Sequence, residues 1–329
     1  MSKIIHNRRQ FLTASALGMG AATLTLGSTG LVGRAHAAAP LATTQAPYFY
    51  RFMHGDAQVT MVSDGPLPLG SPAGNFLGVE EDVINGMLTD NFLPTDNVVL
   101  EQNIPIVNIN GNLILFDTGM GTIDMFGPTT GRLLKSMDEA GIAPEDIDYI
   151  VCTHGHIDHI GGIVGASGPY FPNAELYISQ ADFDYWTDEN KLSGGLGPFV
   201  QAARDNLMPV RERISFFKDE EEFLPGITAM ATPGHTVGHT IFMIESGGSP
   251  LCFIGDLTHH QILLVERPRI EFAYDTDPKQ SADSRVRALD MLAANRIPCM
   301  AFHFPWPGIG HFVKMGDGFR FLPSPMQLG

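Results

Sequence analysis

Short apolar runs of five to eight residues recur along the chain, and most of them end in a polar residue or a turn. Their length and their content of Val, Ile, Leu and Phe predict strands. The predicted strands are AQVTMVSD, IPIVNI, NLILFD, YIVCTH, ELYISQ, ITAMATP, TIFMIES, PLCFIGD and CMAFH. Asn110-Gly111 separates two of these runs and predicts a tight hairpin turn.

Helical patterns lie between the strands, at about residues 131–140, 181–190 and 281–295. The alternation of strands and helices predicts an α/β fold, and strands that follow one another directly predict mixed sheets. The segment KLSGGLGPF, around Gly194–Gly197, predicts a flexible loop that acts as a lid. No linker divides residues 38–329, which predicts a single domain there.

The first 37 residues differ in composition from the rest of the chain. Arg8 and Arg9 precede a mildly apolar stretch that ends at RAHAAAP. This pattern is typical of a twin-arginine export signal that is cleaved after about Ala37, and it predicts a periplasmic or secreted protein. A membrane anchor is the alternative, which the Gly and Thr content of the stretch disfavours.

The charge balance excludes some partners. Removal of residues 1–37 takes away four basic residues and no acidic one, so the formal net charge changes from −16 to −20. A protein this acidic is a poor partner for nucleic acid or for an anionic membrane surface. We expect neutral or cationic ligands.

The three cysteines, Cys152, Cys252 and Cys299, each lie in an apolar run. An odd number leaves at least one thiol unpaired in an exported protein. Their surroundings predict buried, unreactive thiols, with a disulfide as the less favoured alternative.

The densest chemistry lies in THGHIDH, where His154, His156, Asp158 and His159 occupy six positions after a predicted strand. Residues two apart in an extended turn can converge on one cation, and Asp158 and His159 then face a second cation. Imidazole nitrogens and carboxylates bind Zn²⁺, Mn²⁺, Fe or Co²⁺. The alternative is a loop of hydrogen-bonded histidines without a metal.

One loop cannot fill two coordination spheres, so further ligands must come from elsewhere. Three candidates each follow a predicted strand: His235 in TPGHTVGHT, Asp256 in FIGDL and His303 in CMAFH. Each alone is more typical of a cap or a buried polar residue. Together with the first loop, they favour a metal site.

In this order, the four segments resemble the metal-binding pattern of the metallo-β-lactamase superfamily, and LILFDTG, with Asp117, resembles its early strand. The resemblance implies a four-layer αβ/βα sandwich with a two-metal site at the sheet edge. From about Pro47 onward, segments such as FPNAELYISQADFDYW and MGDGFRF are similar to the methyl parathion hydrolase branch.

The resemblance also implies roles for the candidate ligands. It implies a first metal held by three histidines, a second held by Asp158 and two histidines, and Asp256 as a bridge. The histidines of the first metal would be His154, His156 and His235, and those of the second would be His159 and His303. β-Lactamases with a zinc-bound cysteine have it at the place of Asp256, so antibiotic hydrolysis is not expected.

Two cations about 3.5–4 Å apart would make a metal-bridging hydroxide the nucleophile. Asp158 would receive the proton and deliver it to the leaving group. We expect two divalent ions, zinc first, with manganese, iron or cobalt as alternatives. The expected reaction is hydrolysis of lactones or aryl esters, with a phosphotriesterase as the alternative main activity. Redox chemistry and metal storage are two less favoured classes of function.

Around the metals, Asp117 is expected to orient a ligand imidazole or, alternatively, to form a turn. Phe126, Trp186 and Phe199 lie on segments similar to those that line the substrate entrance of the branch; ordinary core packing is the alternative. His259, if it faces the pocket, would narrow the leaving-group side and favour a flat lactone or aryl ester over a bulky phosphotriester.

The remaining expectations concern single residues and partners. Asp64 is interpreted as a turn residue, and His239 as structural. The expected substrate is a small hydrophobic ester, lactone or phosphotriester, with no nucleic-acid or membrane partner. The branch resemblance implies a homodimer.

Overall fold

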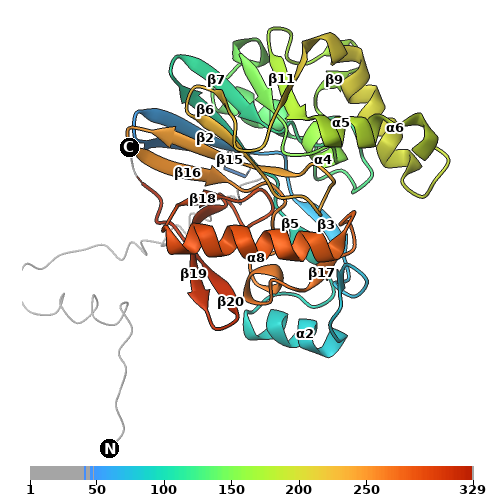
Figure 1. Ribbon diagram of the computed structural model, residues 1–329, viewed down its shortest axis with the longest axis vertical. Helices are drawn as coiled ribbons and strands as arrows, with labels where there is room; N and C mark the ends of the chain where they lie inside the picture. The colour runs from blue at the N-terminus through green and yellow to red at the C-terminus, as the bar shows by residue number, and fades with distance from the viewer. Residues whose placement is uncertain (1–40, 42–44, 47, 328–329) are drawn as a thin grey trace, which may run out of the picture. The chain divides into compact units, whose positions relative to one another are not determined.

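Two mixed, seven-stranded sheets form the framework of the protein (Figure 1). The computed structural model describes residues 41, 45–46 and 48–327. The chain from Ala46 onward forms one compact unit. The predicted export signal and its cleavage site lie outside the described residues.

In the first sheet the strand order is β1-β2-β6-β7-β8-β11-β12. Its first four strands pair antiparallel, and β7, β8, β11 and β12 run parallel. The strands are β1 (Phe49–His54), β2 (Ala57–Ser63), β6 (Asn103–Ile109), β7 (Asn112–Phe116), β8 (Tyr149–Val151), β11 (Glu175–Ser179) and β12 (Ile214–Phe217).

In the second sheet the order is β13-β14-β15-β16-β18-β19-β20. All neighbours pair antiparallel except β16 and β18, which run parallel. The strands are β13 (Glu222–Leu224), β14 (Ile227–Ala231), β15 (Thr240–Ser246), β16 (Ser249–Phe253), β18 (Cys299–Met300), β19 (Ile309–Met315) and β20 (Gly318–Pro323).

The sheets face one another through an apolar core, with helices on their outer sides. Phe116 of the first sheet lies 5.7 Å from Phe242 and 5.6 Å from Phe253 of the second, measured between ring centroids. Helices α3 (Leu133–Glu139) and α5 (Gln180–Thr187) contact the first sheet. Helix α8 (Pro278–Ala294) lies along the second sheet (Figure 1). Its Leu289 and Leu292 belong to the apolar cluster on that side of the sheet. The predicted four-layer α/β sandwich is confirmed.

The predicted hairpin is confirmed: β6 pairs with β7 across Asn110 and Gly111, whose φ angles are 53° and 83°. Positive φ at both positions is what an Asn-Gly turn accommodates. The predicted strands all occur, although β8 and β18 are shorter than their apolar runs.

Helix boundaries differ from the prediction where a side chain caps an end. Asp188 accepts a hydrogen bond from the Asn190 backbone N–H, which ends α5 early and begins a short 3₁₀ turn, η2 (Glu189–Lys191). Helix α8 begins at Pro278, three residues before the predicted start, because the Asp277 side chain caps it there. The predicted loop KLSGGLGPF connects η2 to α6 (Gly197–Leu207) and contains two hydrogen-bonded turns. Its role as a lid stays a prediction.

The sequence patterns did not predict a third cluster of elements, which packs beside the sheet edge around Phe76, Ile84 and Leu264. It comprises β3 (Leu67–Gly70), β4 (Phe76–Leu77), α2 (Glu81–Asp90), β5 (Val98–Leu100), α7 (Leu263–Glu266) and β17 (Glu271–Phe272). Short elements elsewhere are η1 (Pro144–Asp146), α4 (Ile157–Ile160), β9 (Val164–Gly165), β10 (Gly168–Pro169) and η3 (Met208–Arg213).

Two expectations concern burial and membranes. Cys152, Cys252 and Cys299 are free and buried, as predicted, and burial raises the pKa of each thiol. In the part of the chain that the structure describes, no helix has both the length and the apolar character needed to cross a bilayer.

Candidate metal centre

The candidate ligands follow strand ends at one edge of the two sheets. The first loop follows β8 and leads into α4, with His156 immediately before the helix. His235, Asp256 and His303 come after β14, β16 and β18, which run in the same direction within the second sheet. Because strands of one direction end at one edge, residues up to 149 positions apart meet there.

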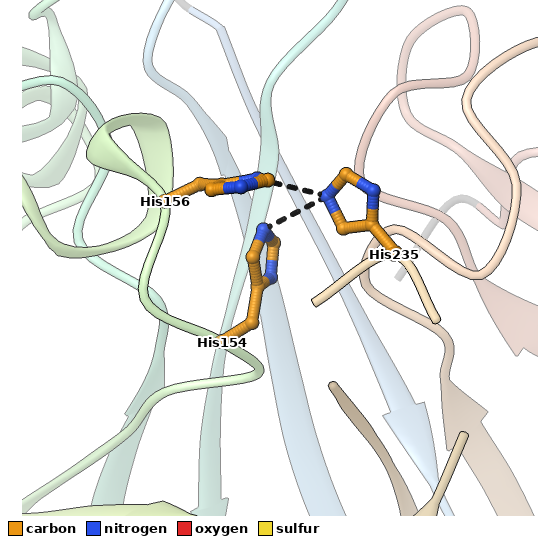
Figure 2. Close-up of side chains that lie close together, drawn as sticks. All are labelled: His154, His156 and His235. Atoms are coloured by element: carbon orange, nitrogen blue, oxygen red, sulfur yellow. Dashed lines mark hydrogen bonds between the residues drawn. The ribbon is translucent and has the colours of Figure 1, made fainter. Parts of the chain in front are cut away.

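The three-histidine group consists of His154, His156 and His235 (Figure 2). His235 Nε2 lies 2.9 Å from His156 Nδ1 and 3.2 Å from His154 Nε2. Figure 2 shows His154 and His156 on one loop and His235 approaching from a facing loop. The three ring nitrogens therefore converge on one point.

The mixed group consists of Asp158, His159, Asp256 and His303. Asp158 Oδ2 lies 3.4 Å from the Nε2 atoms of both His159 and His303. All four side chains are buried. This group offers two carboxylates and two imidazoles to one point.

Asp256 joins the two groups. Its Oδ1 lies 3.3 Å from His159 Nε2, and its Oδ2 lies 3.3 Å from His303 Nε2. The same Oδ2 lies 3.2 Å from His235 Nε2 and 3.8 Å from His154 Nε2. The carboxylate that the resemblance implies as a bridge thus stands between the groups.

Hydrogen bonds to the far side of the candidate ligand rings orient them and fix the nitrogen that each ring presents to the site. Asp117, at a φ of 64°, accepts from His159 Nδ1 at 2.8 Å and from the Thr153 backbone N–H at 2.8 Å. His303 Nδ1 lies 2.8 Å from the Glu101 carbonyl oxygen. Asp117 therefore contacts the imidazole of a candidate ligand, His159, as the sequence resemblance implied.

Sequence reasoning missed the group behind His235. Asp275 Oδ1 lies 2.8 Å from His235 Nδ1, and Asp275 Oδ2 lies 3.7 Å from Arg285. Arg285, fully buried on α8, donates to the carbonyl oxygens of Leu257 and Ile270 and so fixes the segment between Asp256 and Asp275. The sequence contained one signal for this network: Arg285 lies on the face of the predicted helix that is buried, and a buried charge needs an acidic partner.

The pKa shifts of the histidines differ within the three-histidine group as well as between the groups. Burial and the neighbouring imidazoles hold the pKa values of His154 and His156 well below their usual range. Burial also opposes protonation of His303, but Asp256 and Asp158 outweigh it and raise the pKa of His303 to about 9. Asp256 and Asp275 likewise raise the pKa of His235 to about 9.

Several buried polar atoms at this edge lack a hydrogen-bond partner among the described residues, which fits a bound metal. They include His159 Nε2, Asp256 Oδ1 and both ring nitrogens of His259. His259 Nε2 lies 3.0 Å from Asp256 Oδ2 without hydrogen-bond geometry, and His235, Asp256 and His259 form a further group with metal-ligand spacing. Imidazoles with carboxylates suit Zn²⁺ and its first-row neighbours.

A pocket opens onto the metal groups. Phe126, Phe199 and His259 line it, as expected, together with Phe272 and Tyr274. Its remaining apolar wall is formed by Leu67, Leu69, Leu100 and Ile157. Within the described part of the chain, the lining contains no Lys or Arg. The His259 ring stacks on Phe272 with centroids 4.0 Å apart, so it faces inward.

Trp186 does not line this pocket, which corrects the expectation from the sequence. Its indole is 1% exposed and packs edge-on against His156, with ring centroids 4.8 Å apart. It also fills the space next to Gly155, where an added Cβ would lie 2.5 Å from the indole. Trp186 therefore supports a candidate ligand from behind.

Three other residues have clear structural roles. Asp64 is not a simple turn residue: it is buried and accepts from the backbone N–H groups of Met120 and Leu133. Burial raises the pKa of Asp64 to about 6 in spite of these donors. His239 Nε2 accepts from the Asp256 backbone N–H, in agreement with the structural role expected for it. Asp182, like Asp275, is a buried carboxylate that sequence reasoning missed.

The family model of the metallo-beta-lactamase superfamily matches residues 98–299, which is more than half of the chain. The chain belongs to the metallo-beta-lactamase superfamily. The matched segment contains all the residues of the three-histidine group and most of the mixed group. Within this superfamily, the chain is a metallo-hydrolase whose His and Asp clusters have the spacing to bind metal.

Two solved superfamily structures and one curated relative are similar along most of their length. AidC, a dizinc quorum-quenching lactonase, has a TM-score of 0.80 and 29% identity, over 85% of this chain and 99% of that chain. The hydrolase AbOPH has a TM-score of 0.81 and 28% identity, over 86% and 100%. An N-acyl homoserine lactonase from Bacillus sp is 27% identical over 77% of this chain and 96% of its own.

Proposed function

We propose that this protein is a dinuclear metal-dependent hydrolase that acts on lactones or aryl esters. The observation that carries the proposal is the position of Asp256, which lies within 3.3 Å of His235, His159 and His303. One carboxylate between two ligand groups can bind two neighbouring cations at once. The similarity to the dizinc lactonase AidC supports two metal positions.

When bound, two divalent cations would polarise a substrate oxygen and lower the pKa of a water molecule. The residues of the chain would do the rest. Asp256 would hold the two ligand groups at a fixed separation. Asp158, which lines the pocket, would accept a proton during attack and deliver it to the leaving group. No serine or cysteine nucleophile is required.

The pocket walls favour a neutral, hydrophobic substrate. Its aromatic and aliphatic lining would exclude water from much of the substrate. The described lining residues include no Lys or Arg side chain that could bind an anionic substrate. His259 narrows the space beside Asp256. These features support a flat lactone or aryl ester as the main substrate and a bulkier phosphotriester as a secondary one.

A side-by-side turnover assay of the zinc- or manganese-loaded protein tests this proposal. It compares an aromatic lactone, an acyl-homoserine lactone, an aryl ester and a dimethyl aryl phosphotriester, with a chelated control. We expect a lactone or ester to be preferred by about 100-fold in kcat/KM, equivalent to about 2.7 kcal/mol. A preferred phosphotriester would contradict the substrate, and full activity after chelation would contradict the metal chemistry.

The metal identity, the location and the oligomer are part of the same proposal. We expect two equivalents of zinc per chain in metal analysis, with manganese, iron or cobalt as the alternatives. The twin-arginine pattern supports export, so the N-terminal sequence of the periplasmic protein should begin near Ala38. A full-length cytoplasmic product would contradict export.

The branch resemblance supports a homodimer. Sedimentation of the mature protein tests this, and a monomer would contradict it.

A further inference from the structure

Asp182 on α5 is a buried carboxylate between the two loops of the three-histidine group. Its Oδ2 accepts hydrogen bonds from the Gly155 backbone N–H at 2.6 Å and from Thr236 Oγ1 at 2.9 Å. Its Oδ1 accepts from the Gly238 backbone N–H at 2.6 Å. The side chain is fully buried. Gly155 lies between His154 and His156, Thr236 follows His235, and Gly238 lies three residues after His235 in the same loop.

We propose that Asp182 is a positioning residue that holds these two ligand loops at the separation that a metal ion requires. The loops belong to different sheets, and His156 and His235 are 79 residues apart in the sequence. Asp182 donates no atom to the metal site and acts through the backbone of its neighbours. This inference rests on the proposed metal-binding function of the three histidines.

The packing around α5 supports a positioning role. An added Cβ at Gly238 would lie 2.0 Å from Ser179 Oγ, so this loop approaches the start of α5 more closely than a side chain would permit. Ser179 in turn caps α5 by accepting from the Asp182 backbone N–H. The start of α5 therefore acts as a rigid platform for both ligand loops.

Asp64 provides a matched comparison within the same chain. It is also a buried carboxylate, and it accepts from the backbone N–H groups of Met120, Gly131 and Leu133. None of these three residues belongs to a ligand group or flanks one. The loss of Asp64 therefore reports the cost of removing such a carboxylate from the fold alone.

The experiment compares Asp182→Asn with Asp64→Asn in the full chain. Asparagine has a single acceptor oxygen, so its NH₂ group must face the backbone N–H of either Gly155 or Gly238, and that hydrogen bond to a loop is lost. We measure zinc affinity by competition with a chromophoric chelator, and the melting temperature with and without zinc. For Asp182→Asn we expect zinc affinity to fall about 10- to 100-fold. We also expect a smaller rise in melting temperature on zinc binding.

For Asp64→Asn we expect a lower melting temperature of the metal-free protein but an unchanged zinc affinity, because none of the donors to Asp64 belongs to a candidate ligand group or flanks one. Equal zinc affinities in the two variants would overturn the positioning role. A wild-type chain that binds no zinc would instead overturn the proposed function itself, which keeps the two failures distinct.

Thr236→Val covers the case in which Asp182→Asn does not fold. Valine keeps the shape of threonine and removes one hydrogen bond from the Asp182 carboxylate. We expect zinc affinity to fall about 3-fold, with the metal-free melting temperature nearly unchanged. An unchanged zinc affinity in Thr236→Val would overturn the positioning role as well.

Discussion

Two histidines of the three-histidine group, His154 and His156, differ in pKa from the histidines of the mixed group. In the three-histidine group, His154 and His156 are held neutral by burial and by neighbouring imidazoles. In the mixed group, carboxylates raise the pKa of His159 well above its usual range and the pKa of His303 to about 9. A metal ion would have to displace protons from the histidines with raised pKa values, which include His235 of the three-histidine group, but not from His154 and His156.

The largest effect is expected from Asp256→Asn, because Asp256 contacts histidines of both groups. Asparagine keeps the shape of the side chain but removes the negative charge. We expect the metal content to fall from two ions to one or fewer, and kcat/KM to fall by about 10³-fold or more, equivalent to about 4 kcal/mol. Metal analysis and a lactone assay provide the measurement.

Asp290→Asn is the control for that variant, since Asp290 is exposed and lies on the outer helix α8. It should keep both metals and full activity. Retention of two metals and of activity within 10-fold by Asp256→Asn would refute the bridging role.

A pair of variants tests the two groups separately, through the carboxylates that hydrogen-bond the outer ring nitrogens of His159 and His235. Asp117→Asn loosens His159 of the mixed group, and Asp275→Asn loosens His235 of the three-histidine group. Because each carboxylate orients one ring, we expect a 10- to 100-fold loss of affinity at the corresponding metal position. Anomalous scattering from partially loaded crystals gives the occupancy of each position. Equal loss at both positions in both variants would show that the groups do not act separately.

His259→Leu tests the pocket side of the centre. Leucine removes a polar ring beside Asp256 and leaves an apolar wall with more freedom for a tetrahedral phosphorus centre. We expect the ratio of lactone to phosphotriester turnover to fall by about 10-fold, or about 1.4 kcal/mol. An unchanged ratio would show that His259 does not determine the preference for lactones over phosphotriesters.

The smallest effect concerns the pH dependence of stability. The pKa values of His235 and His303 are raised from 6.5 to about 9 in the folded chain. Their contribution to stability is fully present below about pH 6.5 and is lost as the pH rises through about 9. The melting temperature of the chelated protein should fall by roughly 5 °C over this window. The metal-loaded protein, whose imidazoles are neutral ligands, should not show this loss.

The sequence predicted those parts of the molecule that depend on local patterns. The strands, the Asn110-Gly111 hairpin and the four-layer sandwich are confirmed, because apolar runs and turn residues act over a few positions. The loop from His154 to His159 was visible for the same reason. The structure also brings His235, Asp256 and His303 to that loop, although their roles as ligands stay a prediction.

The rest depends on contacts between distant segments, which local patterns do not contain. Asp275 follows His235 by 40 residues, and no motif links the two. Trp186 was assigned to the pocket because a motif gives the position of a residue but not the direction of its side chain. Asp64 was interpreted as a turn residue because its donors lie more than 50 residues away.

The three buried thiols have a consequence for how unfolding can be observed. Cys152 lies in the core between the sheets, whereas Cys252 and Cys299 face one another across paired strands beneath α8. An alkylating reagent reaches none of them in the native state, so each thiol reacts only when its own layer opens. The order in which they are labelled during denaturation therefore reports which layer of the sandwich separates first, without any introduced probe.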